Sequence, residues 1–187
     1  MKKTHILPVL ALASAVMFSF TGCFASNFRA IDDEDDFYDA LDDVAGIDED
    51  ETLSLKNFEF TDGDDVEYYI RAVDGDNYYV YVRFEDDDDA MDWFDDYYQS
   101  FDYTREEKEY KGTLAISERK TIGSAVFDCK ITYGMALPEN YVESDAEIYG
   151  GVYVKDNCFI AVYSKDGSKR DKEKIKNFLK AIGYPKP

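Results

Sequence analysis

Carboxylates are the most frequent side chains in this sequence that could do chemistry. They gather in four runs, at Asp32–Asp36, Asp48–Glu51, Asp62–Asp65 and Glu85–Asp89. Clustered carboxylates can hold divalent cations, and two of them can act as acid and base in glycoside hydrolysis. None of the runs has calcium-loop spacing, because a loop from Asp74 to Glu85 would need glycine where Tyr79 stands. We therefore expect only weak, diffuse binding of divalent cations, and we predict no metal site and no cofactor.

Other catalytic arrangements find little support in the sequence. The only histidine is His5, so residues beyond it cannot form a Ser-His-Asp triad, a Cys-His pair or the usual zinc sites. Ser117 and Lys120 have the Ser-x-x-Lys spacing of penicillin-recognising enzymes, but the companion motifs are absent. We treat this spacing as coincidence and do not predict an enzyme. A hydrolase that uses two carboxylates is the weakest of the alternatives.

The N-terminal segment has the layout of an export signal. Lys2 and Lys3 precede an apolar run from Ile6 to Phe20, which is too short to span a bilayer core comfortably. Thr21-Gly22-Cys23 follows directly and resembles the lipobox of bacterial lipoproteins. That resemblance covers residues 1–23 and implies cleavage before Cys23 and diacylglycerol on its thiol. It implies a protein outside the cytoplasm, anchored to a bacterial membrane by its lipid.

The net charge of the chain limits the classes of partner that it can bind. Without Lys2 and Lys3, 19 basic and 41 acidic residues remain, a formal charge of −22. Residues 32–109 have a net charge of −26, from 31 acidic and 5 basic residues, whereas residues 110–187 have a net charge of +3. Such a field repels nucleic acid and anionic lipid headgroups, so we expect no nucleic-acid partner and membrane contact through the lipid alone. The 45% apolar and 16% aromatic residues are enough for a folded core.

Two further cysteines, Cys129 and Cys158, stand among apolar residues. Outside the cytoplasm they could form a disulfide, which would stabilise the fold by roughly 3 kcal/mol. The alternative is a pair of buried thiols on neighbouring strands. The sequence leaves both open.

Hydrophobic periodicity and turn residues divide the rest of the chain into helices and strands. Helices are predicted at Asp32–Gly46, Asp87–Phe101 and Asp171–Ala181. Strands are predicted at Leu53–Phe60, Val66–Val73, Tyr78–Glu85, Tyr110–Glu118, Ile122–Tyr133, Glu147–Val154 and Cys158–Tyr163. Residues 66–103 and 146–184 both follow the order strand, turn, strand, helix. We therefore predict an α+β fold, an antiparallel sheet with helices packed on one face, built from a duplicated strand-turn-strand-helix unit. Residues 1–22 would be a signal peptide, 23–31 the lipidated cysteine and tether, and 32–187 a single acidic domain.

Strand alternation then predicts a second face, turned away from the helices and rich in tyrosine. Its expected members are Tyr69, Arg71, Tyr79, Tyr81, Arg83, Tyr149, Tyr153, Phe159 and Tyr163. An exposed patch of aromatic rings with arginines is typical of a contact surface. The sequence thus favours a lipid-anchored, non-enzymatic binding module whose partner is a protein, a peptide or a glycan. The main alternative is a divalent-cation-binding protein that uses the acidic half.

Overall fold

The computed structural model describes residues 28, 31, 33–59 and 65–187. Their central feature is a seven-stranded antiparallel sheet with the order β1-β2-β3-β9-β8-β5-β4. Its strands are β1 (Leu53–Glu59), β2 (Asp65–Asp74), β3 (Asn77–Phe84), β4 (Tyr110–Arg119), β5 (Ile122–Ile131), β8 (Glu147–Lys155) and β9 (Cys158–Ser164). A separate hairpin pairs β6 (Met135–Leu137) with β7 (Asn140–Val142). The fold is therefore α+β, as the sequence predicts.

Three helices pack against the sheet, and the starts of the two longer ones follow from capping side chains. They are α1 (Asp35–Ala40), α2 (Asp87–Glu106) and α3 (Lys169–Ala181). α1 continues into a π-helical turn, η1 (Leu41–Ala45), and a 3₁₀ turn, η2 (Glu49–Glu51), leads into β1. The Asp86 carboxylate accepts hydrogen bonds from the first turn of α2, and the Ser168 hydroxyl accepts one from Asp171 in α3. Every predicted helix and strand is present, although the predicted ends at Asp32 and Phe60 lie outside the described residues, and the largest difference elsewhere is the end of α2, which runs to Glu106.

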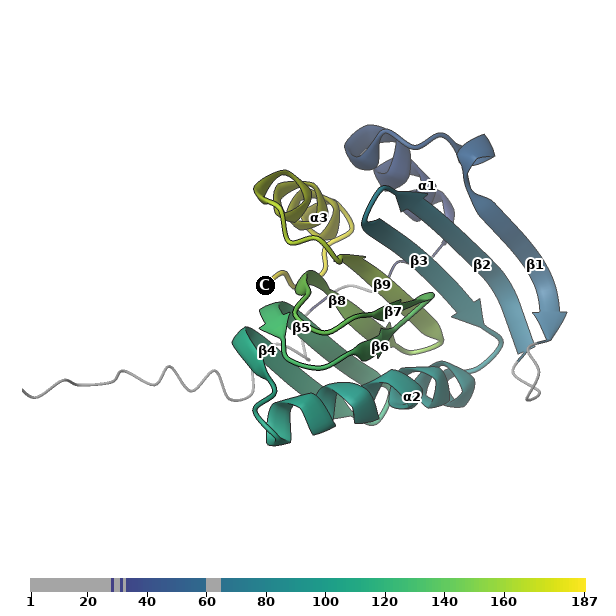
Figure 1. The fold of residues 1–187 in the computed structure, drawn as a ribbon. Coiled ribbons are helices and arrows are strands. Elements are labelled where there is room, and N and C mark those ends of the chain that lie inside the picture. Colours follow the sequence, from purple (N-terminus) through teal and green to yellow (C-terminus); the bar gives the residue numbers. More distant parts are fainter. Residues whose placement is uncertain (1–27, 29–30, 32, 60–64) are drawn as a thin grey trace, which may run out of the picture.

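Helices cover both faces of the sheet (Figure 1). On the face that we call the α2 face, Val80 and Val82 of β3 share a core with Phe94 and Phe101 of α2. On the opposite α3 face, Tyr79 of β3 shares a second core with residues of α1 and α3. The molecule is thus built as three layers, with the sheet in the middle.

The prediction that all helices lie on one face is wrong, and the strand register gives the reason. Antiparallel pairing places Tyr79 opposite Val162 and Tyr81 opposite Ile160, and directly paired residues share a face. The predicted tyrosine face instead places Tyr79 together with Phe159, which point to opposite sides of the sheet. Both strand-turn-strand-helix units exist, as β2-β3-α2 and β8-β9-α3, but each helix covers a different face.

Part of the predicted tether belongs to the folded domain. Phe28 and Ile31 are both buried in the core of the α3 face. The ring of Phe28 lies 4.8 Å from that of Tyr184 and 5.9 Å from that of Tyr153, between centroids. The Lys155 Nζ donates a hydrogen bond of 2.7 Å to the Phe28 carbonyl. These contacts extend the domain to within five residues of Cys23, which itself lies outside the described residues.

The hairpin β6–β7 was not predicted and completes the α2 face. Met135, Leu137 and Val142 are buried and join the core below. The Tyr163 hydroxyl donates a hydrogen bond to the Pro138 carbonyl in the hairpin turn. The hairpin therefore acts as a short cover over the part of the sheet that α2 leaves open.

Candidate functional site

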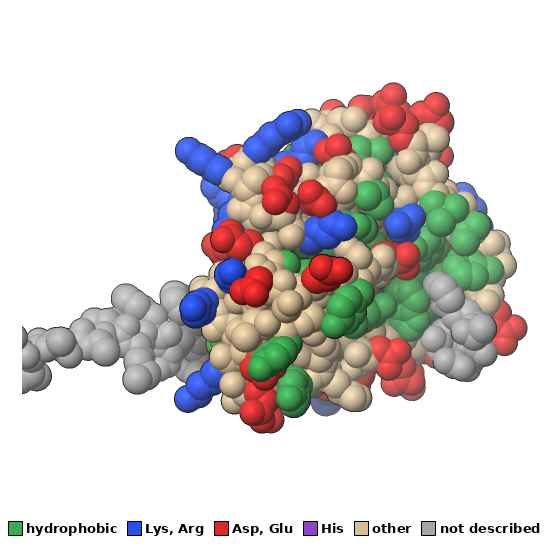
Figure 2. Space-filling model, viewed as in Figure 1, with side chains coloured by type: hydrophobic (Ala, Val, Ile, Leu, Met, Phe, Trp, Pro, Cys, Tyr) green, Lys and Arg blue, Asp and Glu red, His purple; other side chains and the backbone are tan. Residues whose placement is uncertain are grey.

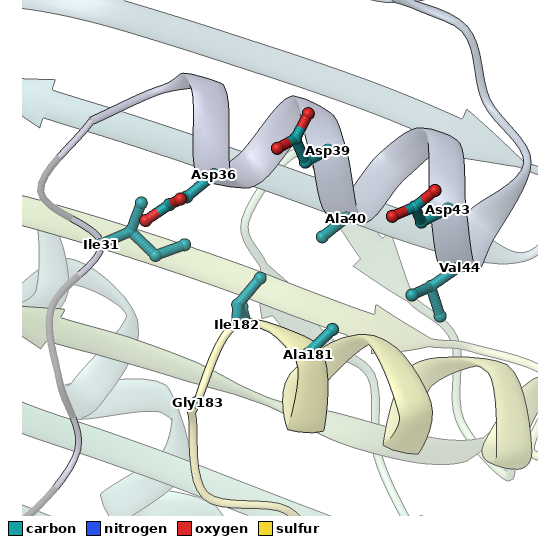
Figure 3. A pocket seen from close by; sticks show the side chains of 9 residues that line it. All are labelled: Ile31, Asp36, Asp39, Ala40, Asp43, Val44, Ala181, Ile182 and Gly183. Atoms are coloured by element: carbon teal, nitrogen blue, oxygen red, sulfur yellow. The ribbon is translucent and has the colours of Figure 1, made fainter.

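A groove separates the α1–η1 helix from the C-terminal end of α3 on the α3 face. Its volume is about 500 Å³, within the range of sites that hold small ligands. The groove is lined by Ile31, Asp36, Asp39, Ala40, Asp43, Val44, Ala181, Ile182 and Gly183 (Figure 3). Its two walls come from segments about 140 residues apart in the sequence.

The floor of the groove is apolar. Ile31, Ala40 and Ile182 are all buried, and Val44 is half-buried. Figure 3 shows Ile182 on the α3 side and Ala40 and Val44 on the α1–η1 side, pointing into the space between the helices. The neighbouring Phe37 and Leu41 point into the core and fix the helix on the sheet. Because Ala40 is small, the two helices leave a hollow above it.

Three carboxylates line the α1–η1 side of this hollow. Asp36, Asp39 and Asp43 follow one another at intervals of three and four residues, so they lie on one side of the helix. All three are exposed, and within the described residues none takes part in an ion pair. Like charges at this spacing repel by a few tenths of a kcal/mol per pair. A cation bound along the groove would remove that repulsion.

A lysine holds the walls of the groove together near η1. The Lys174 Nζ of α3 donates hydrogen bonds of 2.5 Å to the Asp74 carboxylate and 3.1 Å to the Ala45 carbonyl. Gly46 then ends η1 in the left-handed conformation. A contact between α3 and η1 therefore fixes the two helical walls relative to each other.

The residues of the predicted tyrosine surface divide between the two faces. Tyr69, Arg71, Phe159 and Tyr163 lie on the α2 face, as the core cluster and the pairing of Arg71 with Val80 show. Tyr79, Tyr81, Arg83, Tyr149 and Tyr153 lie on the α3 face, as the second core cluster and the pairing of Arg83 with Cys158 show. All seven rings are buried, with at most 5% of any residue exposed. The prediction of one open aromatic surface is therefore wrong.

Tyrosine suits two of these buried positions, Tyr153 and Tyr163, because its ring packs while its hydroxyl reaches a carbonyl near the edge of the core. The Tyr153 hydroxyl donates to the Pro185 carbonyl, just as Tyr163 donates to Pro138. Burial raises the pKa of Tyr79, Tyr81 and Tyr163 above the ordinary tyrosine value. These rings stabilise the core, so a high number of tyrosines does not by itself indicate a contact surface.

The two arginines of that predicted surface make ion pairs at its margins. The Arg83 Nε lies 2.7 Å from the Glu67 carboxylate, and its Nη1 lies 3.4 Å from that of Glu34. The Arg71 Nε lies 3.3 Å from the Glu139 carboxylate in the turn between β6 and β7. Both arginines thus join neighbouring elements of the fold.

The structure also resolves the alternatives for the cysteines. Cys129 belongs to the core of the α2 face and Cys158 to that of the α3 face, and neither forms a disulfide within the described residues. The sheet separates the two side chains, so they cannot form a disulfide with each other. Burial raises the pKa of Cys129 to about 12, which makes it a poor nucleophile.

The acidic runs form no compact metal centre in the part of the chain that the structure describes. The arrangement nearest to acid-base chemistry is the pair Asp95 in α2 and Glu118 in β4. Burial raises the pKa of both carboxyl groups, with a further contribution from Asp92 and Asp96 on Asp95, and from Asp95 on Glu118. Neither residue lines the groove; Glu118 is exposed, whereas Asp95 is half-buried with its Oδ1 shielded from solvent.

Sequence reasoning missed the groove, although one signal was present. The intervals between Asp36, Asp39 and Asp43 match one side of a helix, and Ala40 stands between them. The opposite wall, from Ala181 to Gly183, cannot be assigned to this site without the tertiary structure.

Comparison of the chain with protein-family models, with curated proteins and with solved structures finds no match. Among the described residues, no helix has both the length and the apolar character needed to cross a membrane. The groove and the chemistry of its lining are therefore the features of the molecule that indicate a function.

Proposed function

We propose that this protein is a lipid-anchored, non-enzymatic binding module outside the cytoplasm, and that its groove takes an aliphatic polyamine. The observation that carries the proposal is a row of three exposed carboxylates, Asp36, Asp39 and Asp43, above an apolar floor. Carboxylates that make no ion pair within the described residues favour a cation, and a floor of Ala40, Val44 and Ile182 favours methylene groups. A polyamine combines ammonium groups with methylene chains.

The spacing of the carboxylates supports this class of ligand. Positions one helical turn apart are separated by about 5 Å along the axis. With carbon–carbon bonds of about 1.5 Å, an extended chain of three or four methylene groups separates two nitrogens by about 5–6 Å. Successive ammonium groups of such a polyamine would therefore meet successive aspartates. A compact divalent cation would reach only one or two of them and leave the apolar floor uncovered.

Spermidine binding, measured by isothermal titration calorimetry at low ionic strength, tests the groove. Asp39→Asn combined with Asp43→Asn is expected to weaken binding about tenfold, since exposed ion pairs contribute up to about 1 kcal/mol each. The matched control is Asp48→Asn combined with Asp50→Asn, which changes the net charge equally near η2. Equal weakening in both double variants would show general attraction to an acidic protein. Stronger binding of calcium than of spermidine would favour the cation-binding alternative.

The anchor is proposed on the lipobox, and the docking of Phe28 supports it, because the folded domain begins close to Cys23. Cys23→Ala is expected to abolish lipidation and to leave the chain as an uncleaved precursor or release it from the membrane. The measurement is metabolic labelling with a radioactive fatty acid, together with detergent phase partitioning. Retained label in the variant would contradict the anchor and would leave the groove proposal untouched.

A further inference from the structure

The strand β1 ends the sheet on one side, and nothing in the described part of the chain pairs with its outer edge. Its only strand partner is β2, from Leu53 opposite Arg71 to Glu59 opposite Asp65. An edge strand presents unpaired backbone donors and acceptors that can take up a further strand. Most residues of β1 are exposed, so neither α1 nor α2 covers it.

Apolar side chains surround this edge on the α2 face. Leu53 is 47% exposed, Leu55 43% and Val73, on the neighbouring strand β2, 42%. Leu55 pairs with Tyr69, a member of the α2-face core, so these side chains continue the buried face outward. Figure 2 shows apolar side chains gathered over the outer strands of the sheet, on the right of the view. A strand added to β1 would extend the core and cover these leucines.

The charges around the edge define the kind of strand that fits. Glu49, Asp50 and Glu51 lie directly before β1, and Glu59 ends it. The one lysine of the strand, Lys56, is held over the ring of Tyr68, 4.2 Å from its centroid. A second copy of this chain would bring the same acids to the edge and would be repelled, whereas a basic segment would be attracted.

Asn57 limits how much of the edge can pair. Its φ of 50° breaks the regular strand, and the pairing with β2 skips this residue. A partner is therefore expected to pair with residues 52–56, a short stretch that gives modest affinity.

From these observations we propose that β1 accepts an extended, basic segment of a partner protein with alternating apolar residues, by antiparallel strand addition. The apolar residues of that segment would cover Leu53 and Leu55, and its basic residues would meet the acids before β1. This surface lies apart from the groove and is independent of the polyamine proposal.

Fluorescence anisotropy with a labelled eight-residue peptide of alternating lysine and valine tests the proposal on the purified protein in non-ionic detergent. We expect saturable binding that Leu53→Ser combined with Leu55→Ser weakens roughly tenfold. Because both leucines are half-exposed, this double variant should keep the fold, which far-ultraviolet circular dichroism checks. A peptide of alternating lysine and serine should bind at least tenfold more weakly. The groove variant Asp39→Asn with Asp43→Asn should bind the lysine–valine peptide like the original protein.

Amide hydrogen exchange then distinguishes strand addition from loose attraction. The peptide is expected to slow exchange in residues 52–56 and to leave α3 unchanged. Equal binding of the two lysine peptides, or slowed exchange only elsewhere, would overturn the proposal. The proposal would also be overturned by a dimer, seen in sedimentation velocity, that Leu55→Lys dissociates and the peptide does not. In that case β1 would bind a second copy of the chain.

Discussion

Replacement of Phe178 by alanine is expected to lower the free energy of unfolding by about 3–5 kcal/mol, as for other large buried rings. Phe178 is completely buried on α3. Its ring centroid lies 4.7 Å from that of Tyr79 in β3 and 5.4 Å from that of Phe37 in α1. The substitution would therefore leave a cavity where helix α3, helix α1 and the sheet meet.

Urea denaturation followed by circular dichroism measures this effect. The matched control is Tyr103→Ala on α2, since Tyr103 is 61% exposed and its loss should change stability by less than about 0.5 kcal/mol. Similar losses in the two variants would mean that the α3 layer adds little to the fold. The groove would then lack the rigid wall that the polyamine proposal requires.

The second large effect is expected for Gly150→Ala in β8, at about 3 kcal/mol or more. Gly150 has a φ of 143°, a conformation that side chains rarely adopt. An added Cβ would lie 2.2 Å from the Val162 carbonyl oxygen and 2.5 Å from the Tyr163 Cα. Both atoms belong to the backbone of the paired strand β9, so the clash can be relieved only by moving the strands apart.

Thermal unfolding of Gly150→Ala and Gly75→Ala separates the steric clash of the added Cβ from the backbone strain at a positive φ. Gly75 also has a positive φ, of 60°, but an added Cβ there would meet nothing within 4 Å. Its replacement should cost only the backbone strain, about 1 kcal/mol. Equal melting temperatures for the two variants would show that β8 and β9 can separate without loss, contrary to their position in the centre of the sheet.

The sequence predicted the elements well because each of them has a strong local signal. Phe37, Leu41 and Val44 repeat at helical spacing, and Asp86 and Ser168 cap the helices that follow. The short strands β6 and β7 escaped prediction because three residues are too few for a periodic pattern. Local patterns thus define elements of ordinary length and miss very short ones.

The faces of the sheet were predicted wrongly, although the relevant signal lies in β9. All residues from Cys158 to Ser164 are buried, and the run is apolar up to its last residue. An uninterrupted apolar run is typical of a strand that is covered on both sides, whereas a half-exposed strand alternates. The similarity of the two strand-turn-strand-helix units instead favours a single helical layer, which is wrong because β9 is covered on both sides. The predicted tyrosine surface is wrong for the same reason, since it requires one face of the sheet to be free of helices. The hydroxyl group of a tyrosine does not show whether its ring is exposed.

If Cys23 carries the proposed lipid, the burial of Phe28 would limit how the whole domain can move at the membrane. Five residue steps from Cys23 to Phe28 span at most about 18 Å, whereas a domain of this size is about 40 Å across. If the lipid on Cys23 is held in the bilayer, the segment between Cys23 and Phe28 is shorter than the diameter of the domain. The domain would then be unable to turn over freely, and the end that contains Phe28 would stay next to the lipid. Partners would meet it by diffusion in two dimensions, always from the same side.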